Sequence, residues 1–68
     1  MNEEWKTFFE DEQVGTSDAA SYAIKFARHR MQKNMLVDLN NEMLKEMDFT
    51  IMGDMITILK IKKRAAEQ

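Results

Sequence analysis

The sequence predicts an all-α fold, a compact bundle of five helices that ends in a long C-terminal helix. Its 68 residues contain no proline and only two glycines, so the residues that usually form hairpin turns are nearly missing. Apolar side chains recur at intervals of three and four, the period of an α-helix, and not at intervals of two. Because the hydrophobic fraction of 44% is that of a globular protein, we expect one domain over residues 3–65, with short termini at 1–2 and 66–68.

An aromatic face predicts the first helix, over residues 3–13. Trp5, Phe8 and Phe9 lie three and four positions apart, so they share one side of that helix and are expected to face the core. Gly15 is expected to end the helix, because glycine adopts the left-handed backbone of many helix ends.

An alanine-rich stripe predicts the second helix, over residues 18–30. Thr16 or Ser17 is expected to cap it, since a hydroxyl oxygen accepts a hydrogen bond from an unpaired backbone N–H. The residues expected to face the core, or to widen the apolar stripe, are Ala19, Tyr22, Ala23, Ile24, Phe26 and Ala27.

Two short helices are predicted in the middle of the chain. The apolar segment 35–39 predicts a single turn, and residues 41–47 predict about two turns capped by Asn40 or Asn41. Asp48 is expected in a left-handed turn, which Asp tolerates better than a β-branched residue does.

The last helix is predicted to begin after Thr50 as its cap and to run over residues 51–65. Its apolar side chains cover more than half of its circumference, so we expect it to be the spine of the core, with outer apolar residues left for a partner. One face is expected to consist of Met52, Met55, Ile56, Leu59 and Lys63, enlarged by Ile51, Ile58 and Ile61.

Charge alternates along the chain in blocks. Residues 1–24 carry six acidic side chains and one basic one, and residues 34–59 carry five and one. Residues 25–33 carry four basic side chains, and residues 60–68 carry four basic and one acidic. The formal net charge of −2 argues against a chain that binds nucleic acid or an anionic membrane as a whole, so any basic surface is local.

No set of residues in the sequence predicts catalysis, a metal or a cofactor. The chain has no cysteine, and its one histidine, His29, lies between Arg28 and Arg30, whose positive charge disfavours a bound cation. We therefore expect no enzyme. The lack of cysteine and of a signal-like start predicts an intracellular protein, nuclear or cytoplasmic, with no membrane partner.

The order of these segments resembles the sterile alpha motif (SAM) domain over residues 3–65. The matching segments are Trp5–Phe9, Phe26, Met35–Leu39, Met47–Gly53 and Ile58–Lys60. The resemblance implies a protein-interaction module that associates with itself, as a homo-oligomer, or with another SAM domain.

In that family two surfaces join head to tail. The resemblance implies a mid-loop surface at Asp38, Glu42 and Glu46, and an end-helix surface at Ile51, Met52 and Asp54. Asp54 stands where many members have a basic residue, so the junction is expected to depend on apolar contact more than on charge.

Binding of an RNA hairpin is the alternative function. It would use the two basic blocks, and the residues expected to contact phosphates are Lys25, Arg28, Lys60 and Lys63. Nucleic acid is the less favoured partner, because the aromatic side chains that could stack on bases are expected in the core.

Overall fold

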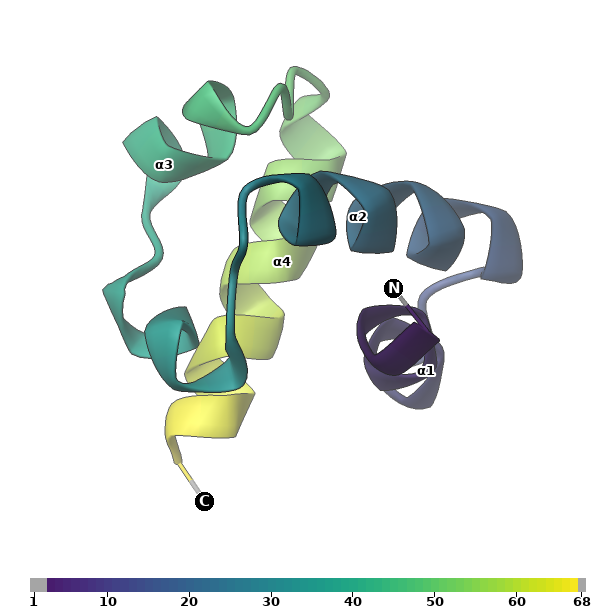
Figure 1. The fold of residues 1–68 in the computed structure, drawn as a ribbon. Helices are drawn as coiled ribbons and strands as arrows, with labels where there is room; N and C mark the ends of the chain where they lie inside the picture. Colours follow the sequence, from purple (N-terminus) through teal and green to yellow (C-terminus); the bar gives the residue numbers. More distant parts are fainter. Residues whose placement is uncertain (1–2, 68) are drawn as a thin grey trace. The chain divides into compact units, whose positions relative to one another are not determined.

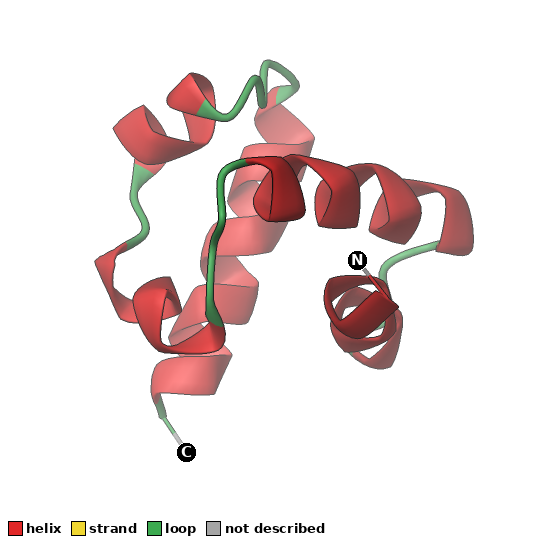
Figure 2. Ribbon diagram, viewed as in Figure 1, coloured by secondary structure: helices red, strands yellow, loops and turns green. Residues whose placement is uncertain are grey.

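The computed structural model describes residues 3–67, which form five helices joined by short loops (Figures 1 and 2). Within these residues there is no strand, so the predicted all-α class is confirmed. The helices are α1 (Glu3–Asp11), α2 (Thr16–Arg28), the 3-10 helix η1 (Lys33–Asp38), α3 (Asn41–Glu46) and α4 (Met52–Ala66).

The chain divides into two compact units. The first extends to Met31 and holds α1 and α2, and the second begins at Gln32 and holds η1, α3 and α4. Of the predicted termini, residues 1–2 and 68 lie outside the described residues. Ala66 belongs to α4, so the helix extends one residue further than predicted.

An aromatic cluster between α1 and α2 forms the core of the first unit. Phe9 is fully buried and meets Tyr22 and Phe26 edge to face, with ring centres 5.3 and 5.2 Å apart. Trp5 meets Phe26 at 4.8 Å, and its indole Nε1 donates a hydrogen bond of 3.0 Å to the carbonyl oxygen of Met31. Because aromatic pairs of this kind each contribute about 0.5–1.5 kcal/mol beyond their buried area, the cluster fixes α1 against α2.

Three helices end at a residue with a left-handed backbone that is not glycine. The φ angles are 69° at Gln13, 57° at Arg30 and 69° at Asp48. In each case the following residue is apolar, and its N–H donates back across the last turn to a buried residue: Val14 to Phe9, Met31 to Phe26 and Phe49 to Leu44. The N–H of the left-handed residue itself also donates to a carbonyl of the last turn, at Glu10, Ala27 and Lys45 respectively. These two hydrogen bonds at each helix end satisfy carbonyl groups that would otherwise lack partners.

Of these three left-handed helix ends, the one at Asp48 was predicted from the sequence. The prediction that Gly15 ends the first helix was wrong, because Gln13 does so and Gly15, with a φ of −56°, is the N-cap residue of α2. Neither Thr16 nor Ser17 caps α2, since both lie inside it. Ile24 is 46% exposed, so it does not widen the core stripe.

The second unit is built from η1, α3 and α4. Asn40 caps α3 as predicted: its side-chain oxygen accepts a hydrogen bond of 2.9 Å from the N–H of Met43. η1 packs against α4, where Lys62 Nζ donates to the carbonyl oxygen of Leu39 at 2.6 Å. The buried side chains of this unit are Leu36, Leu39, Leu44, Met47, Phe49, Ile58 and Ile61.

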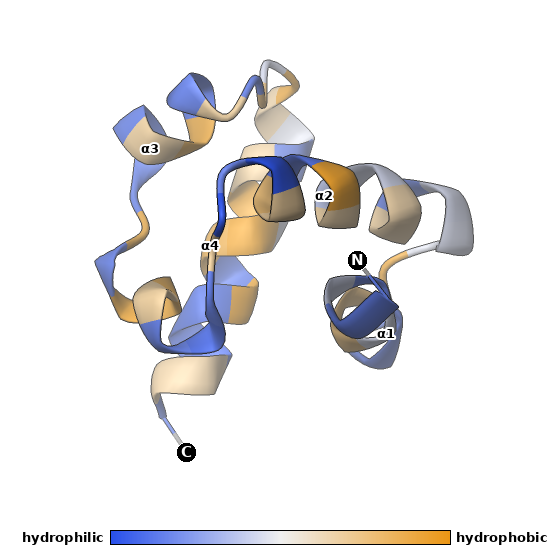
Figure 3. Cartoon of the chain, in the orientation of Figure 1, coloured by the Kyte–Doolittle hydropathy of each residue, from blue (hydrophilic) through white to orange (hydrophobic). Residues whose placement is uncertain are grey.

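The buried face of α4 is rotated relative to the prediction. Ile58 and Ile61 are buried, whereas Met52 is 74% and Ile56 is 50% exposed. Ile56 therefore does not belong to the core, and Met52 is exposed as a member of an end-helix surface has to be. Thr50 is not the cap, because α4 begins at Met52 and its N-cap residue is Ile51. Hydrophobic residues make the middle of α4 orange in Figure 3. No helix within residues 3–67 has the length and apolar character needed to cross a bilayer.

Candidate functional site

Three exposed apolar side chains gather where α4 begins. Ile51 is 63%, Met52 is 74% and Ile56 is 50% exposed, and we call these three residues the α4 patch. Ile51 and Ile56 are β-branched aliphatic residues, which are normally buried in small domains. Adjacent exposed side chains of this kind are typical of an interaction site.

A groove of about 450 Å³ borders the α4 patch, between α3 and the first turns of α4. Met55 is half-buried in it, and Lys45 of α3 supplies its single charged side chain. The residues that line the groove are Asn41, Lys45, Thr50, Met52, Met55 and Ile56. The Asn40 cap and the left-handed turn at Asp48 fix both ends of α3 and so hold the groove's wall in place.

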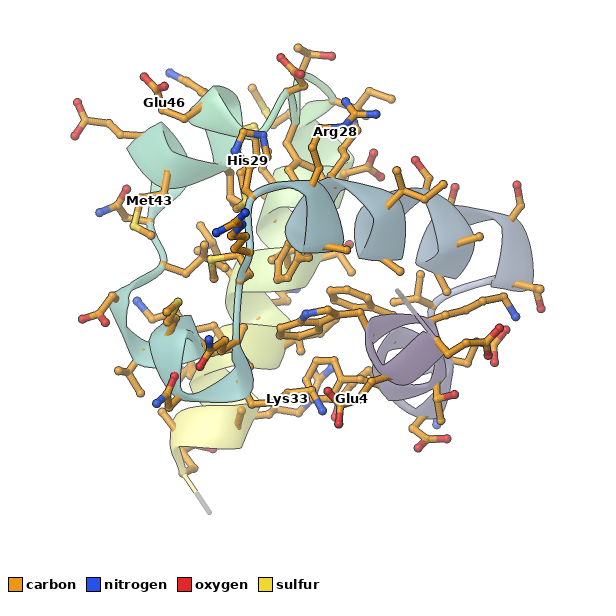
Figure 4. All side chains as sticks on the ribbon, in the orientation of Figure 1. Glu4, Arg28, His29, Lys33, Met43 and Glu46 are labelled. Atoms are coloured by element: carbon orange, nitrogen blue, oxygen red, sulfur yellow. The ribbon has the colours of Figure 1, made fainter. Side chains whose placement is uncertain are left out.

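The predicted acidic residues are all exposed in the same unit. Asp38 ends η1, while Glu42 and Glu46 lie four residues apart on α3 and therefore share one face of that helix. Figure 4 shows Glu46 pointing outward from α3. We call these three residues the acidic surface.

The acidic surface and the groove use different sides of α3. Asn41 and Lys45 line the groove, and each precedes one glutamate of the acidic surface by a single residue. Successive residues of an α-helix are rotated by about 100°, so the two pairs form separate stripes. Two further apolar side chains are exposed on η1 beside Asp38: Met35, at 37%, and Val37, at 61%.

The third predicted residue of the end-helix surface is placed differently from the other two. Asp54 lies in the first turn of α4 and is half-buried, whereas Ile51 and Met52 are exposed. The N-cap residue Ile51 has no side-chain oxygen to accept from the first N–H groups of α4. A carboxylate in the first turn suits the helix dipole, but it opposes the approach of another anion.

The basic residues of the alternative function lie in both units. Lys25 and Arg28 belong to α2, and Lys60 and Lys63 are exposed three residues apart on α4. His29 is exposed and follows the last residue of α2. Among the residues that the structure describes, no group of three or more His, Asp or Glu side chains is arranged to hold a metal ion.

One ion pair in the first unit raises the pKa of its lysine. Lys6 Nζ lies 2.9 Å from Glu10 Oε2, and this hydrogen bond and the glutamate's charge raise the pKa of Lys6 above 10.5. The stabilisation is present at neutral pH and is lost as the pH rises through that raised pKa. Because the pair is solvent-exposed, its contribution to stability is small.

The sequence prediction named Ile51 and Met52 of the α4 patch and all three residues of the acidic surface, but as binding residues it named neither Ile56 nor those that line the groove. Lys45 and Thr50 carry no local signal of such a role, since they line the groove only because the fold brings residues of α3 and of the start of α4 to its two sides. The segment 35–39 was predicted only as a single helical turn, with no statement on which of its side chains, Val37 among them, would be exposed.

Comparison with protein families gives one match. The model of the SAM domain (sterile alpha motif) family matches residues 1–68. No solved structure matches the chain.

Proposed function

The chain belongs to the SAM domain family, and we propose that it associates head to tail with copies of itself, the α4 patch of one copy docking on the acidic surface of the next. SAM domains are generally non-catalytic protein-interaction modules. Another SAM domain is the alternative partner. Within the family, residues 31–40 and 53–60 resemble the SAM domain of a vertebrate chromosome-nineteen open-reading-frame protein. We propose that this chain is more closely related to that SAM domain than to others of the family.

The observation that carries this proposal is the exposure of the α4 patch. Burying a whole methionine or isoleucine side chain contributes roughly 1.5–3 kcal/mol. Since half to three-quarters of each side chain in the patch is exposed, a partner that covers all three gains several kcal/mol. That gain is set against the cost of association, so the apolar contact supports a weak to moderate affinity.

Exposed apolar residues on η1 supply a matching surface on the next copy. Met35 and Val37 lie beside Asp38, so this edge presents apolar side chains next to a carboxylate. Lys45 in the groove favours an incoming acidic group, and Asp54 disfavours one. The two charges offset each other, so apolar contact dominates the junction.

Head-to-tail docking of two different surfaces produces an open chain of subunits rather than a closed dimer. Glu42→Lys alters the acidic surface, and Met52→Glu alters the α4 patch. Each variant alone is expected to be monomeric, because each lacks one half of every junction. Their equimolar mixture is expected to form a dimer and nothing larger, because it contains one intact pair of surfaces.

Matched controls lie in the first unit. Glu4→Lys makes the same charge reversal on α1, and Ile24→Glu makes a comparable apolar-to-acidic change at another exposed position. Both controls are expected to assemble like the wild type in light scattering. A mixture of Glu42→Lys and Met52→Glu that stays monomeric, while the wild type assembles, would contradict the pairing of these two surfaces.

RNA-hairpin binding is the second candidate function, and the exposure of Lys60 and Lys63 on α4 favours it. Against it, the side chains of Trp5, Tyr22 and Phe26 are buried and provide no stacking platform. The test is fluorescence anisotropy with a labelled hairpin. Phosphate contacts predict an affinity that falls steeply with salt, and no binding at low salt excludes this function.

A further inference from the structure

We propose that Met52 and Met35 are oxidation sites, at which hydrogen peroxide converts the thioether to a sulfoxide and thereby disconnects the assembled domains. The inference rests on the proposed function. Among the methionines of residues 3–67, these two are the exposed ones, at 74% and 37%. Met52 belongs to the α4 patch and Met35 to η1, so both proposed sides of the junction carry an exposed methionine.

The other described methionines are better protected. Met47 is only 4% exposed, and Met31, Met43 and Met55 are half-buried. Methionine oxidation requires contact between the sulfur atom and the oxidant, so exposure sets the order of reaction. Met52 is expected to react first, Met35 second and Met47 last.

The chemistry needs no group from the protein. The methionine sulfur attacks one oxygen atom of hydrogen peroxide, the O–O bond breaks, and an S–O bond forms. After proton transfer the second oxygen leaves as water. The sulfur is oxidised by two electrons and the peroxide is reduced by two, and methionine sulfoxide reductases reverse the product.

The sulfoxide oxygen changes what the α4 patch can bury. Ile51 and Ile56, the other members of the α4 patch, offer no hydrogen-bond donor to a new oxygen, and neither do Met35 and Val37, the apolar side chains proposed to cover the patch. The donors Asn41 and Lys45 lie on the α3 side of the groove, outside that apolar contact. Burying a polar group without a partner opposes association, and oxidation of Met52 is expected to weaken it by about tenfold or more. The free domain is expected to stay folded, because Met52 projects into solvent.

Docking should in turn protect the methionine. A second copy that covers the α4 patch shields the sulfur of Met52 and, at the other side of the junction, that of Met35. Their oxidation is therefore expected to slow together as protein concentration rises, whereas the half-buried Met31 of the first unit shows no such dependence.

The experiment treats the chain with hydrogen peroxide at low protein concentration and follows each methionine by peptide mass spectrometry. Assembly is then measured by sedimentation before peroxide, after peroxide and after a sulfoxide reductase. The wild type is expected to lose assembly as Met52 oxidises and to regain it with the reductase. A double variant, Met35→Leu with Met52→Leu, keeps apolar side chains of similar size and is expected to assemble despite peroxide.

The outcomes separate this inference from the proposed function. Assembly that survives complete oxidation of Met52, or a Met47 that reacts as fast as Met52, overturns the inference alone. A wild type that is monomeric before peroxide overturns the proposed function and the inference with it. If the leucine variant fails to assemble, the wild type still provides the test. Assembly that returns after the sulfoxide reductase supports the inference, and assembly that does not return overturns it.

Discussion

Replacing Gln13 by glycine should stabilise the fold, although it removes a side chain. Gln13 ends α1 with a φ of 69°, a conformation that costs most residues about 1–2 kcal/mol and glycine very little. Glycine also gives the unfolded chain more freedom, which offsets about 0.4–1 kcal/mol of that gain. The net expectation is a stabilisation of about 0.5–1 kcal/mol, or a rise of about 2–8 °C in Tm for a domain of this size.

The assay is thermal and urea unfolding followed by circular dichroism. Gln13→Ala is the matched control, because it removes the same side chain while leaving the left-handed backbone strained. Gln13→Gly is expected to be more stable than Gln13→Ala, whose stability is close to that of the wild type. A Gln13→Gly variant that is no more stable than Gln13→Ala would refute the reasoning, since the left-handed strain at residue 13 would then not exceed the entropic cost of glycine.

Three further predictions concern the core, a helix cap and the junction. Met47→Ala is expected to destabilise the fold by about 2–5 kcal/mol in urea unfolding, whereas Met52→Ala leaves folding within about 0.5 kcal/mol and weakens self-association by about 1–2 kcal/mol. Asn40→Ala is expected to cost about 1 kcal/mol of folding free energy, and no loss would mean that its cap on α3 is not formed. Asp54→Asn should strengthen association measured by sedimentation, because it removes an anion facing an acidic partner. Asp18→Asn, at the equivalent position of α2, should leave association unchanged.

Helix ends show where the sequence is informative and where it is not. Asp48 was recognised because Asp is common in left-handed turns, but Gln13 and Arg30 have no such preference. Their backbone is set by the apolar residue that follows each of them, Val14 and Met31, whose N–H bonds back across the last turn. An apolar residue three positions past the last residue of a helix is therefore the signal that residue preferences alone overlook.

Which side of α4 faces the core could not be predicted from the sequence. Because its apolar residues cover most of the helix surface, periodicity predicted the helix but not which side would be buried. The side that carries Ile58 and Ile61 is buried, and this leaves Met52 and Ile56 exposed. Ile51 and Met52 were predicted from the sequence as surface residues, but Ile56 was not, and the groove depends on the position of α3 and is visible only in the folded unit.

Sedimentation equilibrium of the wild-type chain over a wide range of protein concentration tests head-to-tail association most directly. We predict an average mass that rises continuously with concentration and passes that of a dimer, because each added copy leaves an α4 patch and an acidic surface free at the two ends. The mass of a single chain at every concentration, or a plateau at the dimer, would contradict it.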